Sequence, residues 1–382
     1  MLPPLWTCCG WLTDYEMGDA NVRVLCVWHA AVVPEYRERF RALRRIDRSI
    51  DLHVLVPDGS PEGGRWAVYE AHDNDDYHIY QRGSLFTRHP NALVYRTGSR
   101  WLRSLRPDIV HVHEEPWSMA AVQMLAAFRG EAPTVVESWE NVDRPAKWPF
   151  RYVERWSHRS ATAFIAGTPQ VESVLKARGV AKPIAVIPYG TEIQPISLRT
   201  LGSPARIGYV GRCVEEKGII TLLEAIKCSS MDAEYMFIGD GPLVPLLQAF
   251  IRTHSERAIR WMPSLPQAQV LEAIRALDIL VLPSMTTPVW SEQFGRVLVE
   301  AMSVGTVPVG SDSGAIPWVI GACGGVFPVG DHRGLAEVLR RLCSDPEEWL
   351  RLSCNGRRRI RETFSWDSVG RTLLEFYRFV QG

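Results

Sequence analysis

Two glutamates in the second half of the chain have a spacing that suits a ligand rich in hydroxyl groups. Glu292 and Glu300 lie eight residues apart, where a loop is expected to pass into a helix that ends on Gly305. At about 1.5 Å rise per residue, a helix would separate the two carboxylates by about 12 Å. One carboxylate can then hold a hexose and the other a ribose. A diphosphate would lie between them at the helix N-terminus, where unpaired N–H groups favour anions.

Two cations occur earlier, in a glycine-containing turn that follows an apolar run. Arg212 and Lys217 lie five residues apart within YVGRCVEEKGI. Breaking a bond to a diphosphate builds negative charge on the departing group, and fixed cations stabilise that charge without a metal ion. Arginine does so with a planar fork and lysine as a point charge. Ordinary surface charges on a solvated turn are the alternative interpretation, and the turn contains no Walker motif.

The elements that must position these residues alternate between short apolar runs and helical patterns. The apolar runs are continuous, which favours parallel strands buried on both faces of a sheet. The strands predicted in the first half are VRVLCVW, DLHVLVP (Asp51 to Pro57), DIVHVHE, TVVES (Thr134 to Ser138), AFIAGT and IAVIPYG. Those in the second half are ARIGYVGR, YMFIGDG, ILVLPS and TVPVGSD. We therefore predict an α/β protein with two doubly wound, Rossmann-like halves.

Composition narrows the class of protein. With 382 residues the chain is long enough for two domains, and 46% hydrophobic content provides each with a core. Lys plus Arg equals Asp plus Glu at 43 each, so no net field favours nucleic acid. The eight cysteines are scattered and read as reduced thiols, and no run of 18 apolar residues or signal peptide is evident. These features predict a cytoplasmic protein.

The glutamates and the cations together resemble a known family. The E-x7-E stretch and the G-R-x4-K-G turn are similar to those of glycosyltransferase family 4, the group 1 glycosyltransferases. The resemblance implies the GT-B fold, in which two Rossmann-like domains face a central cleft, and a retaining mechanism. It also implies that Glu292 contacts the sugar and Glu300 the ribose, while Arg212 and Lys217 stabilise the leaving diphosphate.

The domain limits follow from the pattern and from this resemblance. We predict a loose N-terminal extension over 1–20 and an acceptor-side Rossmann-like domain over 21–195. A linker over 196–204 precedes a nucleotide-sugar-binding Rossmann-like domain over 205–360. The resemblance implies that a C-terminal helix over 361–382 packs back on the first domain.

Further site residues come from the same resemblance. It assigns the active-site histidine, facing the transferred sugar, to His113 in HVHEEP; a structural role and a metal pair with His111 are the alternatives. The other donor-binding candidates are Gly211, Gly239, Gly241, Gln293, Phe294 and Gly295. The acceptor-side candidates are Glu114, Glu115, Trp139 and Asn141. For the loop SWENVDR, which contains Trp139 and Asn141, an ordinary surface loop is the alternative.

Two segments depart from the family pattern. The first strand is followed by His29, Ala30 and Ala31 instead of a Gly-Gly loop, which puts donor contacts from this loop in doubt. Trp261 and its neighbours replace a usual F-L-G near the nucleobase, so the preferred base is open. A dehydrogenase is disfavoured because no G-x-G-x-x-G follows the first strand.

The resulting expectation is a hexosyltransferase that moves a sugar from a nucleoside diphosphate sugar to an acceptor hydroxyl. The acceptor would be a glycan, a lipid-linked saccharide or a small molecule, in the synthesis of cell-surface polysaccharide or glycoconjugates. No cofactor and no metal ion are required. The alternatives are a GT-B nucleotide-sugar epimerase, which converts the donor alone, and a non-catalytic nucleotide-sugar-binding subunit.

A run of arginines marks the predicted helix Pro34 to Arg48. Its arginines are Arg37, Arg39, Arg41, Arg44, Arg45 and Arg48. A basic amphipathic helix can dock on an anionic membrane surface, here the inner face of the membrane. The alternative is the solvated outer face of a Rossmann helix.

Overall fold

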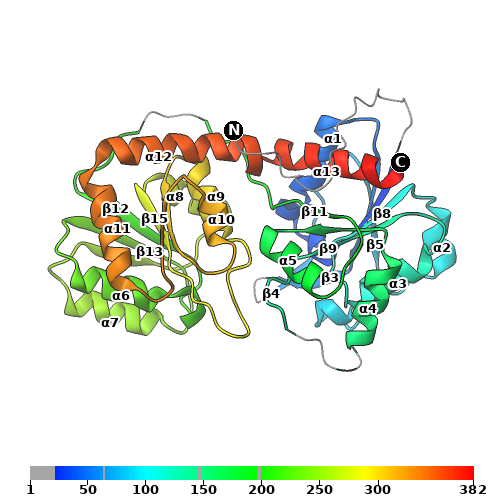
Figure 1. The fold of residues 1–382 in the computed structure, drawn as a ribbon, viewed down its shortest axis with the longest axis horizontal. Coiled ribbons are helices and arrows are strands. Elements are labelled where there is room, and N and C mark those ends of the chain that lie inside the picture. Colours follow the sequence, from blue (N-terminus) through cyan, green and yellow to red (C-terminus); the bar gives the residue numbers. More distant parts are fainter. Residues whose placement is uncertain (1–21, 63–64, 145–147, 149, 196–198) are drawn as a thin grey trace. The chain divides into compact units, whose positions relative to one another are not determined.

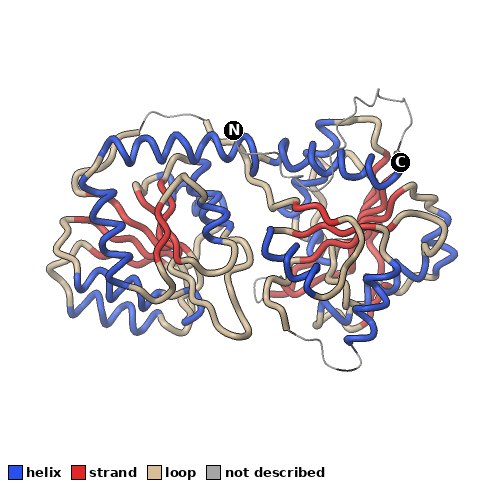
Figure 2. The backbone as a smooth tube through the Cα atoms, in the orientation of Figure 1, coloured by secondary structure: helices blue, strands red, loops and turns tan. Residues whose placement is uncertain are grey.

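The computed structural model describes residues 22–62, 65–144, 148, 150–195 and 199–382. The predicted extension over 1–20 lies outside this part of the chain. The described chain forms two compact units. The N-terminal unit runs to Pro188 and also contains Trp366–Gly382, and the C-terminal unit is Tyr189–Ser365. Within each unit, strands lie at the centre and helices lie around them (Figure 1, Figure 2).

The N-terminal unit is built on a seven-stranded parallel sheet. Its strand order is β11-β10-β9-β8-β1-β2-β5. The strands are β1 (Arg23–Val27), β2 (Asp51–Pro57), β5 (His78–Arg82), β8 (Ile109–Val112), β9 (Thr134–Ser138), β10 (Ala163–Ala166) and β11 (Ile184–Val186). Its α-helices are α1 (Glu38–Ile46), α2 (Ser99–Ser104), α3 (Met119–Ala127), α4 (Phe150–Ser160), α5 (Pro169–Ala177) and α13 (Trp366–Gln381). Two short hairpins, β3 (Gly59–Glu62) with β4 (Arg65–Val68) and β6 (Ser84–Leu85) with β7 (Val94–Tyr95), complete it.

The C-terminal unit is built on a six-stranded parallel sheet of order β14-β13-β12-β15-β16-β17. The strands are β12 (Ala205–Val210), β13 (Ala233–Ile238), β14 (Ile259–Met262), β15 (Ile279–Leu282), β16 (Val307–Ser311) and β17 (Gly325–Phe327). The α-helices are α6 (Ile219–Cys228), α7 (Val244–Thr253), α8 (Gln267–Arg275), α9 (Arg296–Ser303), α10 (Ile316–Ile320), α11 (His332–Ser344) and α12 (Pro346–Arg359). Both sheets have the parallel, crossover-connected topology of a Rossmann-like fold, so the predicted fold class is confirmed.

Local chemistry explains where several helices start. Thr168 and Ser118 cap α5 and α3 by accepting hydrogen bonds from the N–H groups three residues later. Asp345 caps α12 in the same way, and Pro346 occupies the first helical position. A cap followed by an apolar face is the signal that the sequence carries for these helices.

The last helix, α13, belongs to the N-terminal unit although it ends the chain. It packs on α1, where a Cβ on Gly370 would lie 2.6 Å from the side chain of Ile46. Its buried Tyr377 lies 2.7 Å from Nδ1 of His111. The preceding segment, Ile360–Phe364, is a π-helical turn, so the terminal helix begins at Trp366 and not at residue 361.

Only half of the arginines in the arginine-rich segment lie on the surface that we expected for all six. Pro34–Arg37 is a 3₁₀ turn, and the α-helix begins at Glu38. The side chain of Arg37 is fully buried and donates to Asp75 Oδ2 at 2.8 Å. Arg39 and Arg41 are buried as well. Three of the six cations are therefore neutralised inside the unit, while Arg44 is partly exposed and Arg45 and Arg48 are exposed. Fewer charges than the sequence suggested are left for an anionic surface, and membrane docking through this segment stays a prediction. None of the helices in the described residues is both long enough and apolar enough to cross a bilayer.

Candidate active site

Glu292 and Lys217 meet in the C-terminal unit at the end of β15. Lys217 Nζ lies 2.6 Å from Glu292 Oε2, and Ser284 Oγ donates to the same oxygen at 2.6 Å. Glu292 is only 6% exposed, so this pairing compensates a buried carboxylate. The contact joins the two stretches that carry the family resemblance, and it brings two of the predicted catalytic residues together.

Gly218 makes this meeting possible. Its φ is +67°, and a Cβ there would lie 1.8 Å from the carbonyl oxygen of Pro283. Only glycine combines a left-handed conformation with so close an approach. The turn that carries Lys217 is thereby pressed against the end of β15, and the amine reaches the loop that holds Glu292.

The backbone of Glu292 is held by the turn after β16. Its N–H donates to Ser313 Oγ at 3.3 Å, and its carbonyl accepts from the N–H of Ala315 at 3.0 Å. Ser313 Oγ in turn donates to the carbonyl of Met285 at 2.7 Å. A Cβ on Gly314, at φ +55°, would lie 2.0 Å from the carbonyl oxygen of Glu292. The loop is therefore fixed at both ends, which gives the carboxylate a defined direction.

Arg212 is exposed in the turn after β12, where its carbonyl accepts a hydrogen bond from Tyr209 Oη at 2.6 Å. The neighbouring glycines hold two turns together. A Cβ on Gly239 would lie 1.9 Å from the carbonyl oxygen of Gly211, and one on Gly241 would lie 2.5 Å from that of Cys213. The structure thus gives the three predicted glycines a packing role, while the guanidinium of Arg212 stands at the surface.

Glu300 lies on α9, with a side chain that is 14% exposed and accepts from Gln267 Nε2 at 2.8 Å. The expected spacing of the two glutamates needs a correction, because α9 begins at Arg296. Gly295 has a φ of +79° and stands before the helix, so Glu292 is in the loop. The helical rise that predicted about 12 Å therefore applies to only half of the interval.

Phe294 and Gln293 face different environments. Phe294 is 4% exposed, and its ring lies 5.8 Å from that of Phe364 and 6.4 Å from that of Trp318. Its side chain is therefore part of the core, and only its backbone remains a candidate for donor binding. Gln293 is exposed.

The predicted residues of the N-terminal unit gather at the carboxyl ends of β1, β8 and β9. Glu114 is buried and accepts from the N–H of His29 at 2.8 Å, while His29 Nδ1 lies 2.6 Å from its second oxygen. Glu115 accepts from the N–H of Trp139 at 2.7 Å and from Ser138 Oγ at 2.7 Å. These acceptor-side candidates thus hold neighbouring loops to one another.

The remaining acceptor-side candidates are packed side chains. Trp139 Nε1 donates to Glu137 Oε1 at 2.8 Å, and its ring occupies the space that a Cβ on Gly167 would need. Asn141 is 3% exposed. Burial raises the pKa of Glu115 to about 7, although the hydrogen bonds from Ser138 and Trp139 act in the opposite direction.

His113 stands in a buried polar network. Its Nδ1 lies 3.0 Å from Glu137 Oε2, and Arg39 Nη1 lies 2.6 Å from the same oxygen. The ring stacks on His111 at 3.7 Å and on Trp28 at 5.1 Å between centroids. Nε2 of His113 is buried and has no hydrogen-bond partner among the described residues. Burial lowers the pKa of His113 to about 3, so the imidazole is neutral at pH 7.

This network predicts a specific dependence of stability on pH. The folded pKa of His113, about 3, lies below its unfolded value of 6.5, so the unfolded chain binds the extra proton between these values. Stability supplied by the neutral imidazole is present above pH 6.5 and is lost as pH falls, by about 1.4 kcal/mol per unit. Urea unfolding from pH 6.5 to 4 should show a shallower loss for His113→Gln than for the wild type. The exposed-histidine variant His89→Gln should match the wild type, and equal slopes for all three would show that His113 is solvated.

Several residues of these sites escaped the sequence analysis. Glu137 and Arg39 were missed although a carboxylate inside the apolar run TVVES is itself a signal of a buried partner. Ser284 and Ser313 carry no such signal, because serine is common after strands. His29 was noted only as a departure from the family pattern, whereas the structure pairs it with Glu114.

The comparison with family models settles the class. Residues 192–359 match the model for glycosyl transferases group 1, and residues 5–190 match the model for the glycosyl transferase 4-like domain. The chain is a group 1 glycosyltransferase. Its two Rossmann-like units are those of the GT-B fold.

Known proteins share this glycosyltransferase's sequence and fold over most of its length. The glycogen synthase of Mycobacterium tuberculosis is 28% identical over 296 residues, which cover 72% of this chain and 69% of that protein. The phosphatidyl-myo-inositol mannosyltransferase of Mycolicibacterium smegmatis is 24% identical over 355 residues, covering 86% and 83%. The structure of Anabaena Alr3699/HepE in complex with UDP and glucose has a TM-score of 0.66 and 16% identity, covering 94% of this glycosyltransferase and 100% of that chain.

Proposed function

We propose that this glycosyltransferase moves a hexose-type sugar from a nucleoside diphosphate sugar to an acceptor hydroxyl with retention of anomeric configuration. The observation that carries the proposal is the ion pair between Lys217 Nζ and Glu292 Oε2, which are 2.6 Å apart. It brings the turn that we propose binds the diphosphate next to the loop that we propose binds the sugar. The Anabaena structure with UDP and glucose supports a nucleotide sugar as donor. The relatives named glycogen synthase and mannosyltransferase support transfer of a hexose. The mannosyltransferase relative, named for a lipid-linked inositol, supports a glycan or glycolipid acceptor in cell-surface glycoconjugate synthesis.

The chemistry follows from the residues of the C-terminal unit. The bond between the anomeric carbon and the phosphate oxygen breaks, and Arg212 and Lys217 stabilise the charge that develops on the diphosphate. Glu292 binds sugar hydroxyls and Glu300 the ribose. We propose that the acceptor oxygen bonds to the anomeric carbon on the face that the phosphate leaves, while the departing phosphate oxygen takes the acceptor's proton, so no protein nucleophile is required. The two cations take the place of a metal ion. The contact of His113 with the transferred sugar stays a prediction.

A donor screen tests this function. UDP-, GDP- and ADP-linked hexoses are added to the full chain, and thermal stabilisation is measured with magnesium and with EDTA. A stabilising donor is then incubated with candidate acceptors, and NMR reads the anomeric configuration of the product. Retention of configuration and activity in EDTA are expected. An inverted product would overturn the mechanism, and conversion of the donor alone to an epimer would establish the epimerase alternative.

Ser284 provides a sharper test of how Glu292 is positioned. Lys217 Nζ and Ser284 Oγ both donate to Glu292 Oε2, so removing the hydroxyl in Ser284→Ala should lower kcat about tenfold with little change in KM. Ser284→Thr, which keeps the hydroxyl, should retain most of kcat. Ser303→Ala is the matched control, because Ser303 is also buried and donates only to its own helix at Glu300. Equal kcat for Ser284→Ala and the wild type would show that the Ser284 hydroxyl does not orient the carboxylate.

A further inference from the structure

Three potential metal ligands face one another at the edge of the N-terminal sheet. Asp51 and His53 are two residues apart on β2, so their side chains lie on the same face of the strand. His78 on β5 pairs in register with His53. Asp51 and His78 begin their strands, whereas His113 follows the end of β8. In this parallel sheet the cluster therefore lies at the amino ends of the strands, whereas His113 lies at the carboxyl ends.

The distances suit a single ion. The ligand atoms of the three residues all lie within 4.8 Å of one another. His53 Nε2 lies 3.0 Å from Asp51 Oδ1, and the rings of His53 and His78 are 4.8 Å apart between centroids. Ligands about 2.0 to 2.1 Å from a tetrahedral ion are about 3.3 Å apart. Small side-chain rotations are enough to bring the three ligand atoms to that spacing.

Neighbouring groups already orient two of the ligands. Tyr80 Oη lies 2.9 Å from His53 Nδ1 and can accept the proton there, which leaves the lone pair of Nε2 for an ion. Arg23 Nε is 2.5 Å from Asp51 Oδ2, so Oδ1 is the oxygen that points toward His53. No hydrogen bond or ion pair joins the nitrogens of the exposed His78 to another of the described residues.

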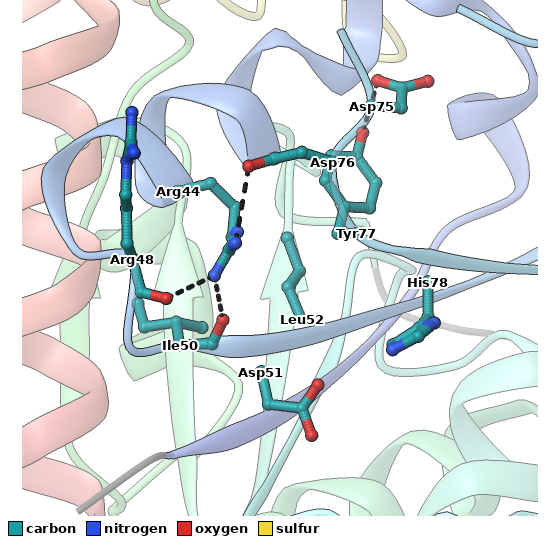
Figure 3. Close-up of a pocket in the computed structure, with 9 residues that line it drawn as sticks. All are labelled: Arg44, Arg48, Ile50, Asp51, Leu52, Asp75, Asp76, Tyr77 and His78. Atoms are coloured by element: carbon teal, nitrogen blue, oxygen red, sulfur yellow. Dashed lines mark hydrogen bonds and ion pairs between the residues drawn. The ribbon is translucent and has the colours of Figure 1, made fainter. Parts of the chain in front are cut away.

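An adjoining pocket gives access to the cluster. It has a volume of about 350 Å³, and both Asp51 and His78 line it (Figure 3). Arg44 and Arg48 also line it, and Arg44 donates to the carbonyls of Arg48 and Ile50 and contacts Asp76. Its guanidinium is thereby held in place by three oxygen acceptors, and the pocket leaves room for water as a further ligand.

We propose that Asp51, His53 and His78 bind a divalent transition-metal ion of the zinc class. Two imidazoles and one carboxylate oxygen favour such an ion over magnesium or calcium, which prefer oxygen ligands alone. The bound ion ties the edge strand β5 to β2 and is separate from the proposed transfer site.

A second cluster of potential metal ligands lies in the same unit, and the experiment must show which of the two clusters binds the ion. Cys26, His111 and His113 also have ligand atoms within 4.8 Å of one another. They are fully surrounded by protein, and the guanidinium of Arg39 lies 3.1 Å from His113 Nδ1. A cation there would need to displace or tolerate a buried positive charge, which makes this site unfavourable.

Cobalt(II) titration of the untagged full chain tests the proposal. The wild type should bind one Co²⁺ with visible d–d bands and without a thiolate charge-transfer band, and Zn²⁺ should displace it. His78→Ala should weaken Co²⁺ binding more than about tenfold, because it removes a direct ligand. His89→Ala, which removes another exposed histidine of the same unit, should bind as the wild type does. Zn²⁺ should raise the Tm of the wild type and of His89→Ala, but not that of His78→Ala.

Three results would overturn the site. They are the absence of Co²⁺ binding by the wild type at millimolar concentration, equal binding by His78→Ala, and a thiolate charge-transfer band that places the ion on cysteine. His78 is exposed, so its replacement should leave the Tm without metal unchanged, and this measurement confirms that the variant is folded. The binding readouts do not depend on the transfer reaction, so failure of the proposed function would leave them interpretable.

Discussion

Arg212→Ala should lower kcat about 10² to 10³-fold while the free energy of unfolding stays almost unchanged. A preorganised cation that meets developing charge typically lowers the barrier by about 3 to 4 kcal/mol. The Arg212 side chain is exposed, and the hydrogen bond from Tyr209 Oη is accepted by the backbone carbonyl of Arg212. Removing the guanidinium therefore costs the fold little. Steady-state kinetics with the stabilising donor, and urea unfolding, measure the two quantities.

Lys217→Ala should lose as much activity and, in contrast, should also lose stability. The sequence placed both cations on an exposed turn, but Lys217 is paired with a carboxylate that is 6% exposed. Without the amine, Glu292 stays buried with one charged partner fewer, which costs about 1 to 3 kcal/mol. Adding Glu292→Gln should restore part of the stability but not the activity.

Lys227→Ala is the matched control, because Lys227 is an exposed lysine of the adjacent helix α6 and forms an ion pair with Glu224 of the same helix. It should retain both activity and stability. Near-normal turnover in Arg212→Ala and Lys217→Ala would rule out their assignment to the leaving diphosphate.

The strands at the centre of each sheet could be predicted closely, because burial on both faces leaves a continuous apolar run. The predicted limits of β2 and β9, Asp51–Pro57 and Thr134–Ser138, are those of the structure. The edge strand β5 was missed. Its sequence HIYQR is half exposed and has no apolar run, so only its pairing with β2 identifies it.

The burial of arginines could not be predicted from the helix in which they occur. Arg37 pairs with Asp75, 38 residues away, and Arg39 with Glu137, 98 residues away. The segment Pro34 to Arg48, with six arginines, has the pattern of a solvated or membrane-facing helix until the tertiary partners are known. Both buried ion pairs depend on the tertiary fold, which brings together residues far apart in the sequence, and not on a local pattern.

For the active-site candidates too, the sequence predicted which residues belong to the site but not the contacts between them. Motif spacing placed Lys217 and Glu292 in the same site, but their direct contact depends on Gly218 lying against the carbonyl of Pro283. The start of α9 was predicted too early because FGRVLVEAM has a continuous helical pattern. The left-handed conformation of Gly295 delays the helix to Arg296.

Glu292→Gln and Glu300→Gln should separate catalysis from donor binding. Ribose contacts persist from the bound donor to the departed diphosphate, so Glu300→Gln should raise KM about tenfold and leave kcat nearly unchanged. Sugar contacts sharpen as the anomeric bond breaks, so Glu292→Gln should lower kcat roughly a hundredfold. Glu292 is the residue in contact with Lys217, whereas Glu300 lies on α9 beside Gln267, which agrees with a division of roles.

Inhibition by the free nucleoside diphosphate distinguishes the two roles without turnover of the sugar. This product contains the ribose and lacks the hexose. Its inhibition constant should therefore rise about tenfold in Glu300→Gln, in parallel with KM, and stay near the wild-type value in Glu292→Gln. If Glu292→Gln instead loses affinity for the diphosphate while Glu300→Gln loses kcat, the two glutamates exchange roles. Glu300 lies on α9, four residues after the first residue of the helix, Arg296, and Glu292 lies in the loop before it. The two outcomes therefore correspond to opposite orientations of the donor along α9.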